Sequence, residues 1–129
     1  MIKSVINVDN KWKIVLFINI DYDKYNVVES ALTDILTPTS VIEDIYDKIG
    51  YAYNSGFTYN NPDYRTSVVG INKTTSRKEM INTIAHEASH VQAAICDYYN
   101  IDLDTEDSAY LIGYIVEHFY KACINCFCN

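Results

Sequence analysis

Two histidines and a glutamate lie within one five-residue stretch of the sequence, His86-Glu-Ala-Ser-His90. In a helix of 3.6 residues per turn, residues four apart lie one above the other, so both imidazoles would reach one metal ion. This is the H-E-x-x-H pattern of zinc sites. Glu87 lies about a quarter-turn away, where its carboxylate would contact a metal-bound water as a general base. We therefore expect Zn²⁺ as the cofactor, His86 and His90 as ligands, and Glu87 as a catalytic residue.

A long helix over about residues 76–99 is expected to carry this motif. The run Ser76-Arg-Lys-Glu79 has the capping-box pattern that begins a helix. An apolar stripe follows at helical spacing, and both histidines fall on roughly the opposite side of the helix. The stripe consists of Ile81, Ile84, Ala88, Val91 and Ile95. The histidines are therefore expected on the surface rather than in the core.

A catalytic zinc needs a third protein ligand and an open fourth position. Asp97 shares the histidine face, but it would lie about 10 Å further along the helix axis. The next helix returns antiparallel after a turn, which would bring Glu106 in its first turn alongside His90. Glu106 is therefore the preferred third metal ligand. The alternatives are Asp102, Asp107 and Glu117.

The last helix, over about residues 105–122, has two different faces. One consists of Glu106, Tyr110, Gly113 and Glu117, and the other of Leu111, Ile115 and Phe119. Asp104 is the expected cap, and the missing side chain of Gly113 predicts a close crossing with the preceding helix. Hydrolysis through a tetrahedral intermediate also needs a hydrogen-bond donor. Tyr110 is the preferred catalytic phenol and Tyr114 the second, with simple packing of either as the alternative.

The residues before the motif predict strands and helices in mixed order. Two β-branched and aromatic segments around Asp9-Asn10 indicate a hairpin over residues 4–20. Two helices should follow, separated by Pro38 and ended by Gly50, with Thr39 or Ser40 as a cap. The fold class is therefore α+β, a single domain over residues 1–129 with a small antiparallel or mixed sheet.

A second hairpin is expected just before the motif helix. Phe57 to Tyr59 and Thr66 to Ile71 flank the turn-forming residues Asn60-Asn-Pro-Asp63. The strand at residues 66–71 is a candidate edge strand on which an extended peptide would lie, and an interior strand is the alternative.

Charge and hydropathy exclude two classes of partner. The formal net charge of −7 would repel phosphate backbones, so no nucleic-acid partner is expected. The longest apolar run, Ile14 to Ile18, is far shorter than the roughly 20 residues of a membrane span. No membrane partner is expected, and without a secretory signal pattern the expected compartment is the cytoplasm.

Three of the four cysteines lie in the segment 123–129, as Cys123-Ile-Asn-Cys126-Phe-Cys128. A soft-metal site built from these three and Cys96 would lack the second paired half of a thiolate zinc motif. Free thiols in a cysteine-rich tail beyond the last helix are therefore the preferred interpretation, and the zinc site should not depend on them.

Residues from Gly56 to about Val116 resemble small zincin-like proteins of Bacteroides and their phages, including crAss-like phages. The resemblance lies in the capped H-E-x-x-H helix, the downstream segment Glu106-Asp-Ser-Ala-Tyr-Leu111, and the stretches Gly56-Phe-Thr-Tyr59 and Ser67-Val-Val. By analogy with gluzincins it implies a minimal zincin-like domain. It also implies zinc ligation by His86, His90 and Glu106, with Glu87 as the base. Tyr110 stands where gluzincins have an aspartate.

The expected function is that of a zinc metallopeptidase, in which Glu87 assists attack of zinc-bound water on a peptide or protein substrate. The resemblance implies a bacterial host cytoplasm or a virion as the location, and a phage or host protein as a partner. The alternative is a structural or interaction protein that keeps the fold without catalysis, because a domain this short offers little material for a substrate-binding lobe. The sequence leaves the oligomeric state open.

Overall fold

A four-stranded mixed sheet forms the centre of the protein in the computed structural model, which describes residues 1–49 and 52–127. The strands are β1 (Ile2–Val8), β2 (Trp12–Ile18), β3 (Gly56–Asn61) and β4 (Thr66–Ile71), in the order β1-β2-β4-β3. The central pair β2 and β4 is parallel, and the two outer pairs are antiparallel. The fold is therefore α+β, as the sequence predicted.

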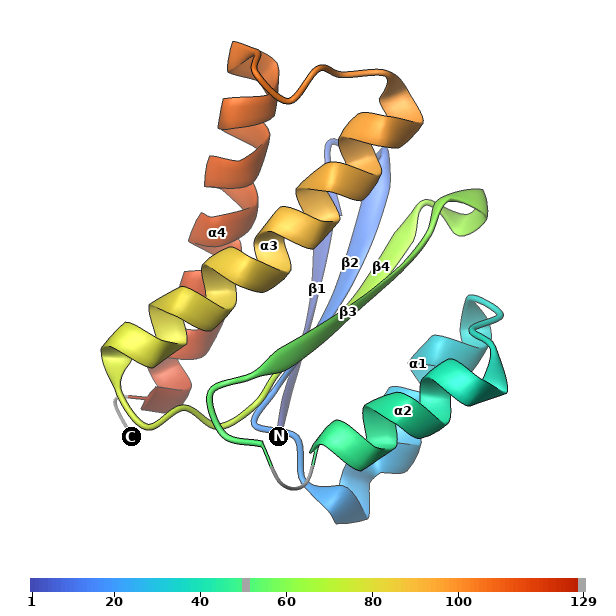
Figure 1. Ribbon diagram of the computed structural model, residues 1–129, viewed down its shortest axis with the longest axis vertical. Coiled ribbons are helices and arrows are strands. Elements are labelled where there is room, and N and C mark those ends of the chain that lie inside the picture. Colours follow the sequence, from blue (N-terminus) through green and yellow to red (C-terminus); the bar gives the residue numbers. More distant parts are fainter. Residues whose placement is uncertain (50–51, 128–129) are drawn as a thin grey trace.

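Two layers of helices cover the sheet (Figure 1). The first consists of α1 (Tyr25–Asp34) and α2 (Thr39–Ile49), and the second of α3 (Arg77–Tyr99) and α4 (Glu106–Phe127). Alternate side chains of a strand point to opposite faces, so the sheet contributes to two separate apolar clusters. Phe17 packs toward the first layer, and Leu16 packs toward the second.

Both predicted hairpins are present, and the first follows directly from its turn residues. Asp9 and Asn10 have φ values of 53° and 56°, and the Lys11 amide donates to the Val8 carbonyl at 2.9 Å. Two successive left-handed residues in this three-residue connection match the right-handed twist of the flanking strands. In the second hairpin, a short 3-10 turn at Pro62–Tyr64 joins β3 to β4.

The prediction that residues 66–71 form an edge strand is wrong. β4 lies between β2 and β3, and all six of its residues are buried. A run of small and β-branched residues suits a strand that is covered on both faces. The edge of the sheet beside α3 is β3 instead.

Helix α3 begins as the sequence predicted, with the Ser76 hydroxyl accepting from the Glu79 amide at 3.1 Å. It ends at Asn100, which has a φ of 56° and closes the helix in the left-handed conformation. The predicted apolar stripe is wrong at one position. Ile81 is 50% exposed, whereas its neighbour Met80 is buried against the sheet.

Helix α4 differs from its prediction in three respects. It continues to Phe127, so Cys123 is buried within the helix rather than lying in a tail. Its first turn is capped by the Thr105 hydroxyl, which accepts from the Ser108 amide at 3.4 Å, and not by Asp104. Gly113 is not a close crossing point, because an added Cβ there would meet nothing within 4 Å.

Among the described residues, no helix is long and apolar enough to cross a membrane. Gly50, expected to end the second helix, and Cys128 lie outside the described residues.

Candidate metal and catalytic site

The two motif histidines lie together on the exposed side of α3, near the edge strand β3. Their Nε2 atoms are 3.3 Å apart, and their rings meet nearly edge to face. Two ligands of a tetrahedral zinc ion, each about 2.0–2.1 Å from the metal, are separated by about 3.3 Å. The imidazoles thus already have the spacing that one zinc ion requires.

Glu87 differs from its histidine neighbours because its side chain turns inward. The residue is only 4% exposed, whereas the His86 side chain is 69% exposed. The Thr58 hydroxyl of β3 donates to Glu87 Oε1 at 2.9 Å, and Oε2 lies 4.0 Å from His86 Nε2. One carboxylate oxygen is therefore fixed by the sheet, and the other is directed toward the histidines.

Strand β3 holds this part of α3 through alternate residues on one face. Besides Thr58, the Asn60 amide donates to the His90 carbonyl at 3.3 Å. Asn60 is itself fixed from behind, because its Oδ1 accepts from the Ser67 hydroxyl, which in turn accepts from the Trp12 indole at 2.9 Å. A line of hydrogen bonds across β2, β4 and β3 thus sets the position of the His90 turn.

Gly56, at the start of β3, makes room for the carboxylate. A Cβ there would lie 2.3 Å from the Gly70 carbonyl oxygen and 3.2 Å from Glu87 Oε2. Only a residue without a side chain lets the strand pass this close to Glu87. Beside it is a small cavity of about 240 Å³, whose other lining residues are Asn54, Ser55, Asn82, Thr83, His86 and Glu87.

The donor set fits a zinc ion. Within the described part of the chain, His86, Glu87 and His90 form the one group of three potential metal ligands whose donor atoms all lie within 4.8 Å of one another. Imidazole and carboxylate are donors that zinc accepts readily. The group has three members, and one of them is the residue that the sequence assigns to catalysis.

Glu106, the preferred third ligand, is not brought to this group. It is exposed in the first turn of α4, and Ser108 is the residue there that faces α3, accepting from the Gln92 amide at 2.9 Å. Two residues correspond to about 200° of helix rotation, so Glu106 points away from α3. The histidines also lie on the β3 side of α3, and α4 packs on the other side.

The alternative acids are also engaged elsewhere or directed elsewhere. Glu117 is exposed and pairs with Lys121 at 3.0 Å, one turn along the same helix. Asp102 and Asp107 are exposed as well, and Asp107 lines a separate cavity beside β1 and β2. None of the three belongs to the His86, Glu87 and His90 group.

The tyrosines chosen as oxyanion donors lie at the opposite edge of the sheet. The Tyr114 hydroxyl donates to the carbonyl of Asn7 in β1 at 3.0 Å. Tyr110 is 74% exposed and lines the same cavity as Asp107. Because β1 and β3 are the two outermost strands, neither phenol is near the histidines.

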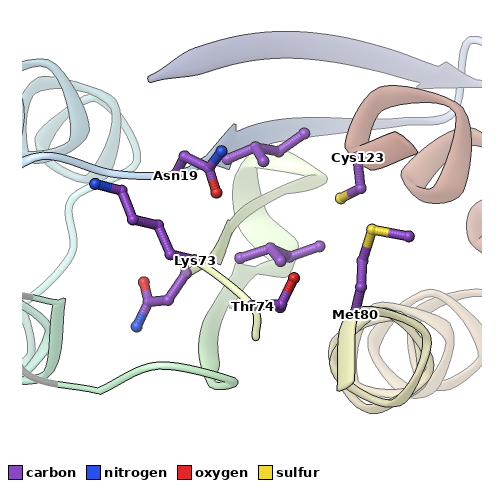
Figure 2. Close-up of a pocket in the computed structure, with 8 residues that line it drawn as sticks. Asn19, Lys73, Thr74, Met80 and Cys123 are labelled. Atoms are coloured by element: carbon purple, nitrogen blue, oxygen red, sulfur yellow. The ribbon is translucent and has the colours of Figure 1, made fainter. Parts of the chain in front are cut away.

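The cysteines do not form a common site in the described residues. Cys96 lies 3.6 Å from the Ser108 hydroxyl, and Cys123 follows Ser108 by fifteen residues of α4, about 22 Å along the axis. Figure 2 shows Cys123 and Met80 facing one another beside a cavity of about 220 Å³, with Asn19, Lys73 and Thr74 on its other side. Only the backbone of Cys126 is described.

The positioning residues on β3 were missed by sequence reasoning. Gly56, Thr58 and Asn60 recur at a period of two, and this alternation of small and polar residues is the signal that could have identified them. A period of two on a strand next to a motif helix indicates one face directed at that helix.

A comparison with protein-family models finds no match to this chain, and comparisons with curated proteins and with solved structures find none either. The geometry of the chain itself therefore carries the functional argument.

Proposed function

We propose that the protein is a zinc-dependent peptidase in which His86 and His90 hold the metal and Glu87 is the general base. The observation that carries this proposal is the 3.3 Å separation of two exposed imidazole nitrogens beside a carboxylate that is buried and hydrogen-bonded. Zinc bound there would supply Lewis-acid chemistry, since it lowers the pKa of water and polarises a carbonyl oxygen.

The two oxygens of Glu87 would have different tasks. Thr58 occupies Oε1 and fixes the carboxylate plane, which leaves Oε2 on the histidine side. A water that attacks the substrate carbonyl carbon transfers its proton to Oε2, and Glu87 then returns that proton to the leaving amine as the C–N bond breaks. Because one oxygen is held by a hydrogen bond, the carboxylate is already oriented for proton transfer before the substrate binds.

The edge strand favours a peptide or protein segment as the substrate. β3 is the outermost strand beside the histidines, and an extended peptide pairs with such an edge through main-chain hydrogen bonds. The cavity next to His86 and Glu87 is large enough for one side chain. From the resemblance, the proposal also includes a zincin-like fold family and a phage or host protein as the partner. It places the protein in the cytoplasm or in the virion.

A second candidate is a non-catalytic metal site that stabilises the protein or an interaction. The observation that favours it is the composition of the metal-competent group, in which Glu87 is the one carboxylate and Glu106 is absent. If Glu87 is itself the third ligand, it has no free oxygen for proton transfer. The two functions thus assign different roles to one residue.

The Glu87→Gln variant separates these functions. The glutamine Oε1 still accepts from Thr58, so we expect an unchanged fold and unchanged zinc stoichiometry, while cleavage of a mixed peptide library falls by roughly a hundredfold or more. Elemental analysis and mass spectrometry of the cleaved peptides measure the two quantities. Glu43→Gln, an exposed change on α2, serves as the matched control.

Three outcomes would contradict the peptidase proposal. Loss of zinc from Glu87→Gln would make Glu87 a ligand and support the second candidate. Equal cleavage by wild type and variant would remove Glu87 from the chemistry. No cleavage by zinc-loaded wild type would leave the metal site without this activity.

A further inference from the structure

The cavity lined by Asp107 and Tyr110 lies on the α3–α4 side of the protein, next to the β1–β2 turn. Its volume is about 580 Å³, within the range of small-molecule sites. α4 contributes Asp107, Tyr110, Leu111 and Tyr114, which share one helix face at positions i, i+3, i+4 and i+7. The other lining residues are Val8, Asp9, Lys11, Trp12, Ile95, Tyr99 and Ile101.

Hydrogen bonds fix three of the four aromatic residues that line this cavity, Trp12, Tyr99 and Tyr114, before any ligand binds. The Tyr99 hydroxyl donates to the Lys11 carbonyl at 2.8 Å, and the Tyr114 hydroxyl donates to the Asn7 carbonyl at 3.0 Å. The Trp12 indole donates to Ser67. Because these three polar atoms are already paired, the three residues present mainly ring surface to the cavity and lose little side-chain entropy on binding, whereas the exposed Tyr110 would be ordered by the ligand.

The charges around the cavity favour a cation. Asp9 comes from the β1–β2 turn and Asp107 from α4, and in the described residues neither forms a salt bridge. Lys11 is the one basic lining residue, and its Nζ lies 5.8 Å from the centre of the Tyr99 ring. Two carboxylates against one ammonium leave the lining negative, and the Lys11 contact shows that a wall of this cavity already accepts a positive charge.

We infer that this cavity is a binding site for a small organic cation with an apolar body, an amine or guanidine held between Tyr110, Tyr114 and the two carboxylates. The aliphatic lining residues would contact the body of the ligand, and the aspartates its charge. The site is independent of the proposed zinc chemistry, since it lies beside β1 whereas the histidines lie beside β3.

Trp12 offers a direct reporter for this site. It is the single tryptophan of the chain and lines the cavity, so its fluorescence should respond to an occupant. We expect a saturable change with 2-phenylethylamine and at least roughly tenfold weaker binding of 2-phenylethanol, which has the same body without the charge. Methylammonium, which has the charge without the body, should also bind more weakly.

Variants locate the response on the cavity. Asp107→Asn and Tyr110→Ala change exposed residues, so the fold should persist. Each variant should weaken the binding of 2-phenylethylamine by about fivefold to tenfold. Asp63→Asn and Tyr64→Ala, in the β3–β4 connection, are the matched controls and should bind like wild type.

Equal binding of amine and alcohol would overturn the assignment of a cation. An absence of saturable binding for all three probes, or unchanged binding in both cavity variants, would overturn the site. None of these measurements depends on zinc or on peptide cleavage, so failure here and failure of the peptidase proposal are distinguishable.

Discussion

The two faces of the central sheet are built from similar elements but carry different groups. The face under α1 and α2 buries an almost wholly apolar cluster, with Phe17, Val28 and Leu32 fully enclosed. The face under α3 and α4 has an equally enclosed apolar centre, yet polar residues lie at its margin beside β3. Both faces are closed by a pair of helices, so helix packing alone does not explain the difference.

The difference arises at the edge of the sheet. On the α3 face, β3 presents Gly56, Thr58 and Asn60, which are too small or too polar to fill a core. On the opposite face the same strand presents Phe57 and Tyr59, which pack with the first helix layer. One strand therefore serves a structural cluster with its odd-numbered residues and a polar site with its even-numbered ones. Variants on the two faces of the sheet should therefore affect different properties of the protein.

The largest expected effect is the loss of zinc from the proposed site on α3. His86→Ala removes one of two closely spaced imidazoles, so we expect zinc affinity to fall by roughly a hundredfold or more. His118→Ala is the matched control, because this third histidine packs on Tyr114 in α4. Elemental analysis after dialysis measures both. Equal zinc in the two variants would remove His86 from the site.

The same assay decides the position of the third ligand. From the placement of Glu106 we expect Glu106→Gln to retain its zinc. A loss comparable to that of His86→Ala would mean that Glu106 is a zinc ligand, as the sequence resemblance implies, and that the first turn of α4 rearranges when metal binds.

A smaller effect is expected from the hydrogen bond between β3 and the carboxylate. Thr58→Val keeps the shape of the side chain but removes the donor to Glu87 Oε1, so peptide cleavage should fall by about tenfold with zinc content unchanged. Thr58→Ser restores the hydroxyl and should restore most of the activity. If serine fails to rescue while its melting temperature matches the wild type, the hydrogen bond is not what positions Glu87.

Two glycines on the α3–α4 face should respond with opposite signs. Gly56→Ala places a Cβ against the Gly70 carbonyl and should destabilise the protein by about 1–3 kcal/mol. Gly113→Ala meets open space on an exposed helix and should stabilise it by about 0.5–1 kcal/mol. Urea unfolding measures both free energies. The same sign for the two variants would contradict the packing described for β3.

The smallest effect concerns the other face and is visible mainly at high pH. Burial raises the pKa of Tyr25 to about 12 from 10.0, with a further contribution from Glu29, and its hydroxyl donates to the Ile42 carbonyl at 2.6 Å. A pKa raised by folding gives stability that is complete below pH 10 and lost as the pH rises toward 12. Tyr25→Phe should lower the free energy of unfolding by about 1 kcal/mol at neutral pH. On going to high pH, the variant should lose less stability than the wild type, because it has no phenol to ionise.

Urea unfolding of wild type and Tyr25→Phe across this pH range measures the difference. Zinc content should be the same in both proteins, since Tyr25 belongs to the face without the histidines. Parallel losses at high pH would show that the phenol does not carry the alkaline transition.

Local signals predicted most of the secondary structure. Ser76 and Glu79 begin α3 because a capping box needs only neighbours in sequence, and Asp9 and Asn10 make the first turn for the same reason. The paired histidines followed from helix spacing alone. The apolar stripe failed at Ile81 because a one-residue rotation of the helix on the sheet decides whether position 80 or 81 is buried.

Contacts between distant segments could not be predicted in this way. Strand order placed β4 inside the sheet and made β3 the edge. The small and β-branched residues of β4 suit a strand covered on both faces, but they do not specify which strands lie beside it. The packing of α4 on α3 through Ser108 directs Glu106 away from His90. The length of the turn between the two helices would also have allowed Glu106 to lie beside His90. The rotation of a helix about its axis is set by all of its contacts together.

By itself, the sequence determined that two histidines would share a helix face with a glutamate beside them, because helical periodicity is a property of the backbone. Only the tertiary structure decided that Glu87 is buried while its neighbour His86 is exposed, that Thr58 holds one of its oxygens, and that Tyr110 lies beside another cavity. These features depend on which strand lies next to α3 and on which side α4 packs. Both result from the simultaneous burial of apolar surface over the whole chain.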